Sequence, residues 1–400
     1  MPRAFLVVLD SVGIGGAPDA DQFFNGDLPD TGANTVGHIA QVCASLPRGP
    51  LHLPHLSGLG LGRAVHLASG EDAPGLKSDI TGLWGAASEV SPGKDTPSGH
   101  WELAGVPVPF AWHYFPNDIP AFPDDLSRAV AEAAGTQDIL GNCHASGTEI
   151  LDRLGAEHLS TGWPICYTSV DSVFQIAAHE EVFGLERLLS LCAEIAPRLH
   201  AMNVGRVIAR PFKGNPEQGF TRTANRKDFA RPLPSPGLCD WVQQAGGTVH
   251  AIGKIGDIFS MQGIDDAVKG RDAALMEHLH AAVAEAADHS LTFANLVEFD
   301  SEYGHRRDLE GYAAALEWFD RKLGRLLGQL RAGDMLLITA DHGNDPTWAG
   351  TDHTRERVPV LVAGKGVGEI GQVGFVDVAA AIADHLDLPE RGPGTSFLPD

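Results

Sequence analysis

Residues 335–353, MLLITADHGNDPTWAGTDH, are the stretch that decides the fold of this chain. The apolar run 335–339 follows a Gly-Asp turn, a pattern typical of a buried strand in a parallel sheet. The strand delivers Asp341 and His342 at its carboxyl end, where open α/β sheets carry their chemistry. His353 follows on a Gly-rich return loop. This arrangement favours a divalent-cation site, and a capped turn with an exposed loop histidine is the alternative interpretation.

Two other segments repeat the pattern of an apolar run followed by a carboxylate. Residues 4–9 predict a strand that ends in Asp10, and residues 291–299 predict one that ends in Asp300, with His305 following shortly after. Because parallel strands end at one edge of a sheet, we expect these side chains to lie together. Carboxylates and imidazoles without a thiolate suit two adjacent divalent cations, Mn²⁺ or Zn²⁺ rather than Mg²⁺. The predicted ligands are Asp10, Asp300, His305, Asp341, His342 and His353.

A hydroxyl group is predicted beside these ligands. In GKDTPSGHWE, residues 93–102, glycine and proline force an irregular loop that leads into a helix. The helix is predicted to start at Ser98, so Thr96 would lie just before its N-terminus, where free N–H groups and the helix dipole favour a phosphate. A divalent cation can stabilise its alkoxide, which makes Thr96 the candidate nucleophile, and an ordinary helix cap is the alternative. Ser98 and Ser11 are weaker candidates.

The middle of the chain differs in character and predicts an inserted domain. Residues 107–221 combine a Pro-rich aromatic entry with helices over 124–134 and 185–199 and a strand over 206–212. We therefore expect an α/β protein with a central, mostly parallel sheet and an inserted α+β cap domain. The core would consist of residues 1–106 and 222–400, and the cap of residues 107–221.

Three cationic side chains are candidates for binding an anionic substrate. Arg206 and Arg210 lie in the predicted cap with Asp171, and a fixed guanidinium fork suits phosphate, although each arginine alone could serve an ordinary ion pair. Lys254 follows a predicted strand in the second half of the core, where a solvated lysine and a phosphate contact are both open.

Composition narrows the classes of partner. A formal charge of −23 argues against a nucleic-acid backbone or an anionic membrane surface as partner. A small anionic substrate is still compatible, provided that metals and a few basic residues reverse the field locally. The five cysteines lack a C-x-x-C spacing, and no apolar run is long enough to span a bilayer, so we expect a cytoplasmic protein with reduced thiols. No obligate protein partner is inferred.

The motifs together resemble the alkaline phosphatase superfamily and, within it, the phosphopentomutases. The segments that carry the resemblance span nearly the whole chain: VVLDSVGIGGAPDA, GKDTPSGHWE, TSVDSVFQIAAHE, GRVIARPF, NLVEFDSEYGHRRD and ITADHGNDPTWAGTDHTRE. The resemblance implies a core metal domain interrupted by a cap, with Thr96 carrying the phosphoryl group. By the same resemblance, Asp10, Asp341 and His342 hold the cation nearer Thr96, and Asp300, His305 and His353 hold the other. The implied substrate residues are Ser169, Asp171 and Val173 facing the sugar, with Arg206, Arg210 and Lys254 near the distal phosphate.

The implied reaction interconverts α-D-ribose 1-phosphate and D-ribose 5-phosphate, and the 2-deoxyribose pair. It runs through phospho-Thr96 and a 1,5-bisphosphate, with Mn²⁺ as the expected cation and a sugar bisphosphate as an activator that could be required. A closed cap would keep water from the phosphoenzyme. The alternatives are a cofactor-independent phosphoglycerate mutase, for which Ser11 is the serine near the first Asp, a phosphomonoesterase, and a non-catalytic metal-storage protein.

Overall fold

The computed structural model describes residues 2–169 and 172–399. The chain forms two compact units, one of Met1–Pro109 with Leu233–Asp400 and one of Phe110–Pro232. The sequence placed the end of the inserted segment at residue 221, but β10 (Lys227–Ala230) still pairs with β8 (Arg206–Asn215). The charged segment after residue 221 is therefore part of the second unit's sheet, and the chain leaves that unit about ten residues later than expected.

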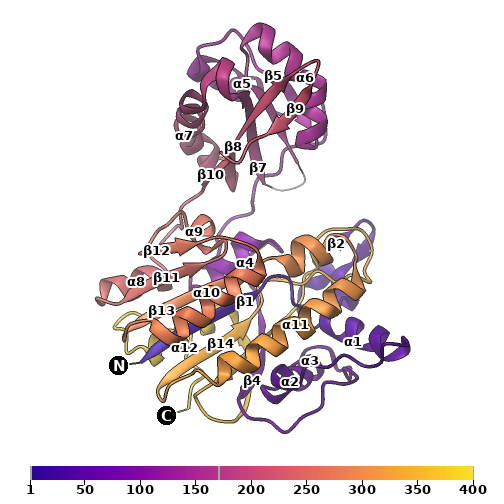
Figure 1. Cartoon of the computed structure of the whole chain (residues 1–400), viewed down its shortest axis with the longest axis vertical. Helices are drawn as coiled ribbons and strands as arrows, with labels where there is room; N and C mark the ends of the chain where they lie inside the picture. Colours follow the sequence, from indigo (N-terminus) through magenta and orange to yellow (C-terminus); the bar gives the residue numbers. More distant parts are fainter. Residues whose placement is uncertain (1, 170–171, 400) are drawn as a thin grey trace. The chain divides into compact units, whose positions relative to one another are not determined.

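The first unit is built on a sheet whose described strands run in the order β12, β11, β13, β1, β14, β15, β4 and β16 (Figure 1). Among these strands, β15 alone runs antiparallel to both of its neighbours, and all other pairs are parallel. The predicted α/β class with a mostly parallel sheet is confirmed. In sheet order, the bounds are Asp266–Val268, Thr248–Ile252, Ser290–Leu296, Arg3–Leu9, Asp334–Thr339, Val358–Ala363, Leu83–Ser88 and Gly368–Gly374.

Helices cover this sheet in two groups (Figure 1). Every residue of β1, β13 and β14 is buried, as expected for parallel strands with both faces covered. Helices α10 (Asp272–Glu285) and α11 (Leu309–Leu327) pack together, whereas α4 (Thr96–Leu103) and α8 (Leu238–Gln244) pack against α12 (Phe375–His385). The remaining elements of this unit are α1 (Thr35–Ser45), α2 (Pro54–Gly58), α3 (Leu61–Ser69), α9 (Ile255–Ile258), a hairpin of β2 (Phe24–Asn25) and β3 (Leu28–Pro29), and the turns η1 (Ala20–Gln22), η2 (Asp30–Gly32) and η4 (Phe299–Gly304).

The central strands end at one edge of the sheet. Leu9 of β1 pairs with Leu296 of β13, and Val8 pairs with Thr339 of β14, so these strands stop within a residue or two of one another. The strand predicted over 291–299 is three residues shorter than expected at this end, because the Asp272 carboxylate accepts hydrogen bonds from the N–H groups of residues 297 and 298. Asp300 therefore lies in the π-helical turn η4 rather than directly at a strand end.

The second unit has a mixed sheet with helices on both faces. Its described strands run in the order β10, β8, β7, β6 and β5, with β9 also paired to β8. Parallel and antiparallel pairs alternate along this order, which agrees with the predicted α+β character. Cys166, Phe174 and Ile176 face one apolar core with α5 and α7, whereas Ile165 and Ala177 face another with α6, because side chains alternate along a strand. The other bounds are β5 (Leu140–His144), β6 (Ile165–Thr168), β7 (Val173–His179), β9 (Gly219–Arg222), α5 (Asp124–Ala134), α6 (Gly147–Thr161), η3 (Glu180–Gly184) and α7 (Leu185–Ala201).

The described helices contain no segment that is both long enough and apolar enough to cross a lipid bilayer.

Candidate metal centre

Asp10, Asp341 and His342 meet where β1 and β14 end, and we call them the inner group. The His342 Nε2 atom lies 3.4 Å from Asp10 Oδ1 and 3.3 Å from Asp341 Oδ2. All three residues are at most 2% exposed. The N–H of Ser11 donates to Asp341 Oδ1 over 3.1 Å, so the turn after β1 holds the carboxylate that follows β14.

Asp300, His305 and His353 form an outer group on the turn η4 and the return loop. Asp300 Oδ2 lies 3.1 Å from His305 Nε2, and Asp300 Oδ1 lies 3.4 Å from His353 Nε2. The N–H of His305 donates to the Asp300 carbonyl, five residues back, over 3.0 Å. This π-helical hydrogen bond brings the imidazole onto the carboxylate, and such turns occur frequently at functional sites. The His305 side chain is 41% exposed, whereas those of Asp300 and His353 are 9% and 12% exposed, so the outer group is open to solvent mainly at His305.

The two groups form one continuous cluster. Ligand atoms of Asp300, His305 and His353 lie within 4.8 Å of one another, and so do those of Asp10, Asp300 and His342. Asp300 thus belongs to both sets. The structure brings all six predicted ligands together, although it connects Asp300 more closely to the inner group than the sequence indicated.

The donor set fits divalent cations. The Nδ1 atoms of His305, His342 and His353 lie 2.6, 3.1 and 2.7 Å from backbone carbonyl oxygens. Since a carbonyl can only accept, each Nδ1 carries a proton and each Nε2 faces the cluster, the tautomer that orients a histidine ligand. Within the described residues, the buried Asp10 Oδ1 receives no hydrogen bond. These oxygen and nitrogen donors are the types that Mn²⁺ and Zn²⁺ accept.

The electrostatics of the two groups differ. Burial lowers the pKa of His342 to about 4. Burial also disfavours charge on His353, but Asp300 outweighs it and raises the pKa of His353 to about 10. Burial, followed by repulsion from Asp341 and Asp300, raises the pKa of Asp10 well above its usual value. Against burial, His353 and His305 hold the pKa of Asp300 well below its usual value. The crowded carboxylates therefore favour added positive charge, which a bound cation would supply.

Thr96 lies at the start of helix α4, beside the inner group. The helix begins at Thr96 itself, two residues earlier than the sequence indicated, because Asp95 caps it by accepting a hydrogen bond from the Ser98 N–H over 3.0 Å. Thr96 Oγ1 lies 3.4 Å from His342 Nε2. A Cβ atom on Gly99 would lie 2.2 Å from the Asp341 carbonyl oxygen, so glycine is required for α4 to approach the end of β14.

Two buried side chains that the sequence analysis did not single out connect Thr96 to the inner group. His100 Nδ1 lies 2.9 Å from the Thr96 carbonyl and 3.1 Å from Asp341 Oδ2. The Asn295 amide donates to His100 Nε2 over 3.0 Å and to Asp10 Oδ2 over 3.1 Å. The sequence offered one sign of Asn295: it is an asparagine inside the apolar strand LTFANLV, and a buried amide requires hydrogen-bond partners.

Ser11, the rival nucleophile, is a turn residue. It has a positive φ of 70°, is fully buried, and its Oγ lies 3.0 Å from the buried Tyr312 hydroxyl. Ser98 is also buried, and its hydroxyl donates to the Asp95 carboxylate over 3.0 Å. Both serine hydroxyls are buried and already have hydrogen-bond partners in the protein.

The predicted substrate residues are distributed over both units. In the second unit, Asp171 lies outside the described residues and Ser169 is half-buried after β6. Val173, the first residue of β7, is only 1% exposed, which argues against contact between its side chain and a sugar. In the first unit, Lys254 is exposed and lines a pocket of about 280 Å³ with Asp272.

The arginines of the second unit include two that the sequence analysis did not assign to the site. Arg206 is engaged by Asp228, with Nη1 3.6 Å from Oδ2, and Arg210 donates from Nε to the Gln175 side chain over 3.0 Å. Burial raises the pKa of Tyr167, and the positive charges of Arg210, Arg222 and Arg226 oppose that shift. These three arginines are here called the arginine cluster, and Arg226 is paired with Asp228 through two hydrogen bonds of 2.7 Å.

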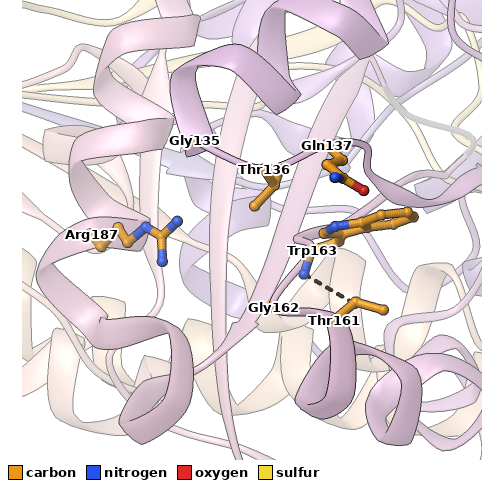
Figure 2. A pocket seen from close by; sticks show the side chains of 7 residues that line it. All are labelled: Gly135, Thr136, Gln137, Thr161, Gly162, Trp163 and Arg187. Atoms are coloured by element: carbon orange, nitrogen blue, oxygen red, sulfur yellow. Dashed lines mark hydrogen bonds between the residues drawn. The ribbon is translucent and has the colours of Figure 1, made fainter.

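A larger pocket in the second unit is separate from all of these residues. Figure 2 shows this cavity of about 490 Å³, which lies where α5 and α6 end. The backbone N–H of Trp163 donates to the Thr161 hydroxyl, and the Arg187 guanidinium donates to the carbonyl of Ala134. These polar groups form hydrogen bonds within the second unit itself. The lining residues are Gly135, Thr136, Gln137, Thr161, Gly162, Trp163 and Arg187.

Comparisons with known proteins identify the family of the chain. A family model described as the metalloenzyme superfamily matches residues 2–390. A phosphopentomutase from Chelativorans sp. (strain BNC1) is 55% identical over 410 residues, which cover 100% of this chain and 98% of the relative. A phosphopentomutase from Methylobacterium sp. (strain 4-46) is 56% identical, with 97% and 98% covered. A solved phosphoglycerate mutase from Leishmania mexicana is 12% identical, with 99% and 97% covered and a TM-score of 0.40.

The sheet and its cluster of carboxylates and imidazoles are those of a member of the metalloenzyme superfamily, to which the family match assigns this chain. Identity above 50% over nearly full length narrows the assignment further. The chain belongs to the phosphopentomutases, and it is accordingly an isomerase of the phosphotransferase type.

Proposed function

We propose that this isomerase interconverts α-D-ribose 1-phosphate and D-ribose 5-phosphate, and the corresponding 2-deoxyribose phosphates, by way of a phosphothreonine at Thr96. The observation that carries the proposal is the place of the Thr96 hydroxyl, at the N-terminus of α4 and 3.4 Å from the Nε2 atom of an inner-group histidine. Free backbone N–H groups at a helix N-terminus suit a phosphoryl group. A threonine in this position can therefore carry and release one.

The reaction would proceed in two transfers. A free hydroxyl of the substrate attacks the phosphorus of phospho-Thr96, so that the Thr96 oxygen leaves and a pentose 1,5-bisphosphate forms. The proton lost by the attacking hydroxyl balances the one gained by Thr96. After the bisphosphate turns over, Thr96 takes the other phosphoryl group and releases the isomeric monophosphate. His100 would hold the backbone of Thr96 in place throughout, because it bonds the Thr96 carbonyl.

Two divalent cations, Mn²⁺ in our proposal, would be held by the inner group and the outer group, with Asp300 close to both. When bound, they would stabilise negative charge on the Thr96 oxygen and on the phosphoryl oxygens. The chain's own contribution is to present three Nε2 atoms toward the cluster and to fix the carboxylates through Asn295 and the Ser11 N–H.

We further propose that the second unit, residues 110–232, serves as the cap and that its arginine cluster receives the phosphate that is not being transferred. The supporting observation is the concentration of Arg210, Arg222 and Arg226 around one buried tyrosine. Ser169 and Asp171 are proposed to contact the sugar, and Lys254 of the first unit is proposed to contact phosphate. Arg206 and Arg226 are weaker candidates than Arg210, because Asp228 engages both of them.

Mass spectrometry tests the proposal directly. We expect incubation with Mn²⁺ and a hexose 1,6-bisphosphate, a candidate activator, to place phosphate on Thr96, and ribose 5-phosphate then to give ribose 1-phosphate with little free phosphate. Thr96→Ala should lose turnover and keep its metals, and Thr96→Ser serves as the matched control. Phosphate on Ser11, or rapid release of inorganic phosphate, would favour another member of the superfamily. A chain that binds metals but acquires no phosphate would favour a storage role.

A further inference from the structure

Arg307, which no ligand assignment includes, makes an unusual set of contacts next to the outer group. Its guanidinium has five N–H donors, and five acceptors surround it. Nε lies 2.8 Å from the Gly350 carbonyl, and Nη2 lies 3.0 Å from the Asp352 carbonyl and 3.4 Å from that of Ala349. Nη1 donates to the Gly304 carbonyl over 2.8 Å and to Asn344 Oδ1. The side chain is thus saturated with hydrogen bonds.

These contacts reach every member of the outer group through an intermediary. The Asn344 amide donates from Nδ2 to Asp300 Oδ1 over 2.7 Å. Arg307 donates to the other end of the same amide, Asn344 Oδ1, and so fixes the orientation of the amide. The Gly304 and Asp352 carbonyls immediately precede His305 and His353. The Thr351 carbonyl, which accepts from His305 Nδ1, lies between two carbonyls that Arg307 holds.

The backbone of Arg307 supports a functional constraint. Its φ is 55°, in the left-handed region that residues other than glycine rarely adopt. Such a conformation persists where surrounding contacts enforce it, and it occurs often at functional sites. The preceding residue, Arg306, differs in each respect: its guanidinium is 64% exposed and pairs with Glu302 one helical turn back.

We propose that Arg307 is a positioning residue for the outer metal site, which it assembles by joining the turn η4, Asn344 and the return loop. The inner group is supported instead by Asn295, His100 and the Ser11 N–H. Loss of Arg307 should therefore weaken one of two cations and spare the other. The inference rests on the proposed assignment of the cluster as a two-cation site.

Whether loss of Arg307 weakens or tightens metal binding distinguishes a positioning role from an electrostatic one. A cation close to a metal site repels the metal, so removal of the arginine charge alone would tighten metal binding. Positioning predicts the opposite, because an unsupported ligand set binds more weakly. Lysine keeps the charge but has three donors and no planar fork, so Arg307→Lys should also bind weakly.

The test is a Mn²⁺ titration of the metal-free full-length protein, followed by electron paramagnetic resonance. We expect wild type to bind two Mn²⁺ ions, and Arg307→Gln to weaken one of them by about 10- to 100-fold while the other stays within about twofold. Arg306→Gln is the matched control and should bind both ions at least as tightly as wild type. Adding His305→Gln to Arg307→Gln should weaken binding little beyond His305→Gln alone, because both changes act on the same site.

Three results would overturn the inference. Arg307→Gln could leave both sites unchanged, tighten either one, or weaken both equally, and the last would indicate a general structural role. The inner site reports on folding within the same titration, because a misfolded chain would lose both ions. If wild type itself does not bind two ions, the assignment of the metal cluster fails, which is distinguishable from failure of the role of Arg307.

Discussion

The inner and outer groups offer similar ligand atoms but are supported in different ways. Inner residues follow directly from buried strands and are at most 2% exposed, with side-chain partners from a neighbouring strand and from helix α4. Outer residues lie on a π-helical turn and a loop. Backbone carbonyls accept from the two histidines, and the Asn344 amide donates to Asp300. The comparison indicates that the sheet supports the inner group, whereas in our proposal the loop contacts of Arg307 support the outer group.

The largest expected effect is the loss of mutase turnover when Thr96, beside the inner group, is replaced. Thr96→Ala should lower mutase turnover by at least about 10⁴-fold, because no phosphoenzyme can form, while both cations still bind. Turnover is measured with ribose 5-phosphate, and metal content by elemental analysis. An active Thr96→Ala variant would remove the reason for placing the chemistry beside the inner group.

Loss of one ligand from each group should affect turnover unequally. His342→Gln should lower turnover by about 10³-fold, since a bound cation supplies several kcal/mol of transition-state stabilisation beside Thr96. His305→Gln should lose one cation and reduce turnover less, because His305 is partly exposed and farther along the cluster. Steady-state kinetics at saturating Mn²⁺ test this, and equal losses would contradict a functional difference between the groups.

Removal of the inner group's supporting amide should have an intermediate effect. Asn295→Ala takes away the hydrogen bonds to Asp10 and His100, so inner-site affinity should fall by about 10- to 100-fold. Outer-site affinity should change little. Mn²⁺ titration measures both, and Arg307→Gln provides the reciprocal variant. Weakening of the outer site by Asn295→Ala would show that the two groups are not independently supported.

The smallest effect is a difference in protonation of the metal-free protein at pH 7. His342, with its pKa lowered to about 4, should be neutral, and His353, with its pKa raised to about 10, should be protonated. Nitrogen-15 NMR of labelled histidines, assigned with single His→Gln variants, distinguishes the two states. A neutral His353 at pH 7 would contradict the proposed influence of Asp300.

The same shift has a consequence for stability. Because the pKa of His353 is raised on folding, its stabilising contribution is complete below its ordinary value of 6.5 and is lost as pH rises to about 10. The free energy of unfolding of the metal-free protein should therefore fall over this window. His353→Gln should flatten that fall, which denaturant unfolding at several pH values can measure.

The sequence by itself determined the sheet class and most of the cluster. Apolar runs that end in Asp10 and in Asp341 with His342 predict parallel strands and a shared edge, because hydrophobic patterning and the sheet rule are local and general. The helices over 124–134 and 185–199 were also predicted to within two residues. The loop before α4 also predicted that Thr96 lies close to a helix N-terminus, as the structure has it.

Tertiary structure decided how the ligands are supported. The amide of Asn295 and four of the five hydrogen bonds of Arg307 join segments far apart in the chain. The boundary of the second unit likewise depends on β10 returning to pair with β8. Sequence patterns report which face of an element is buried. They do not report which distant group satisfies a buried donor or acceptor, because that depends on packing of the folded chain.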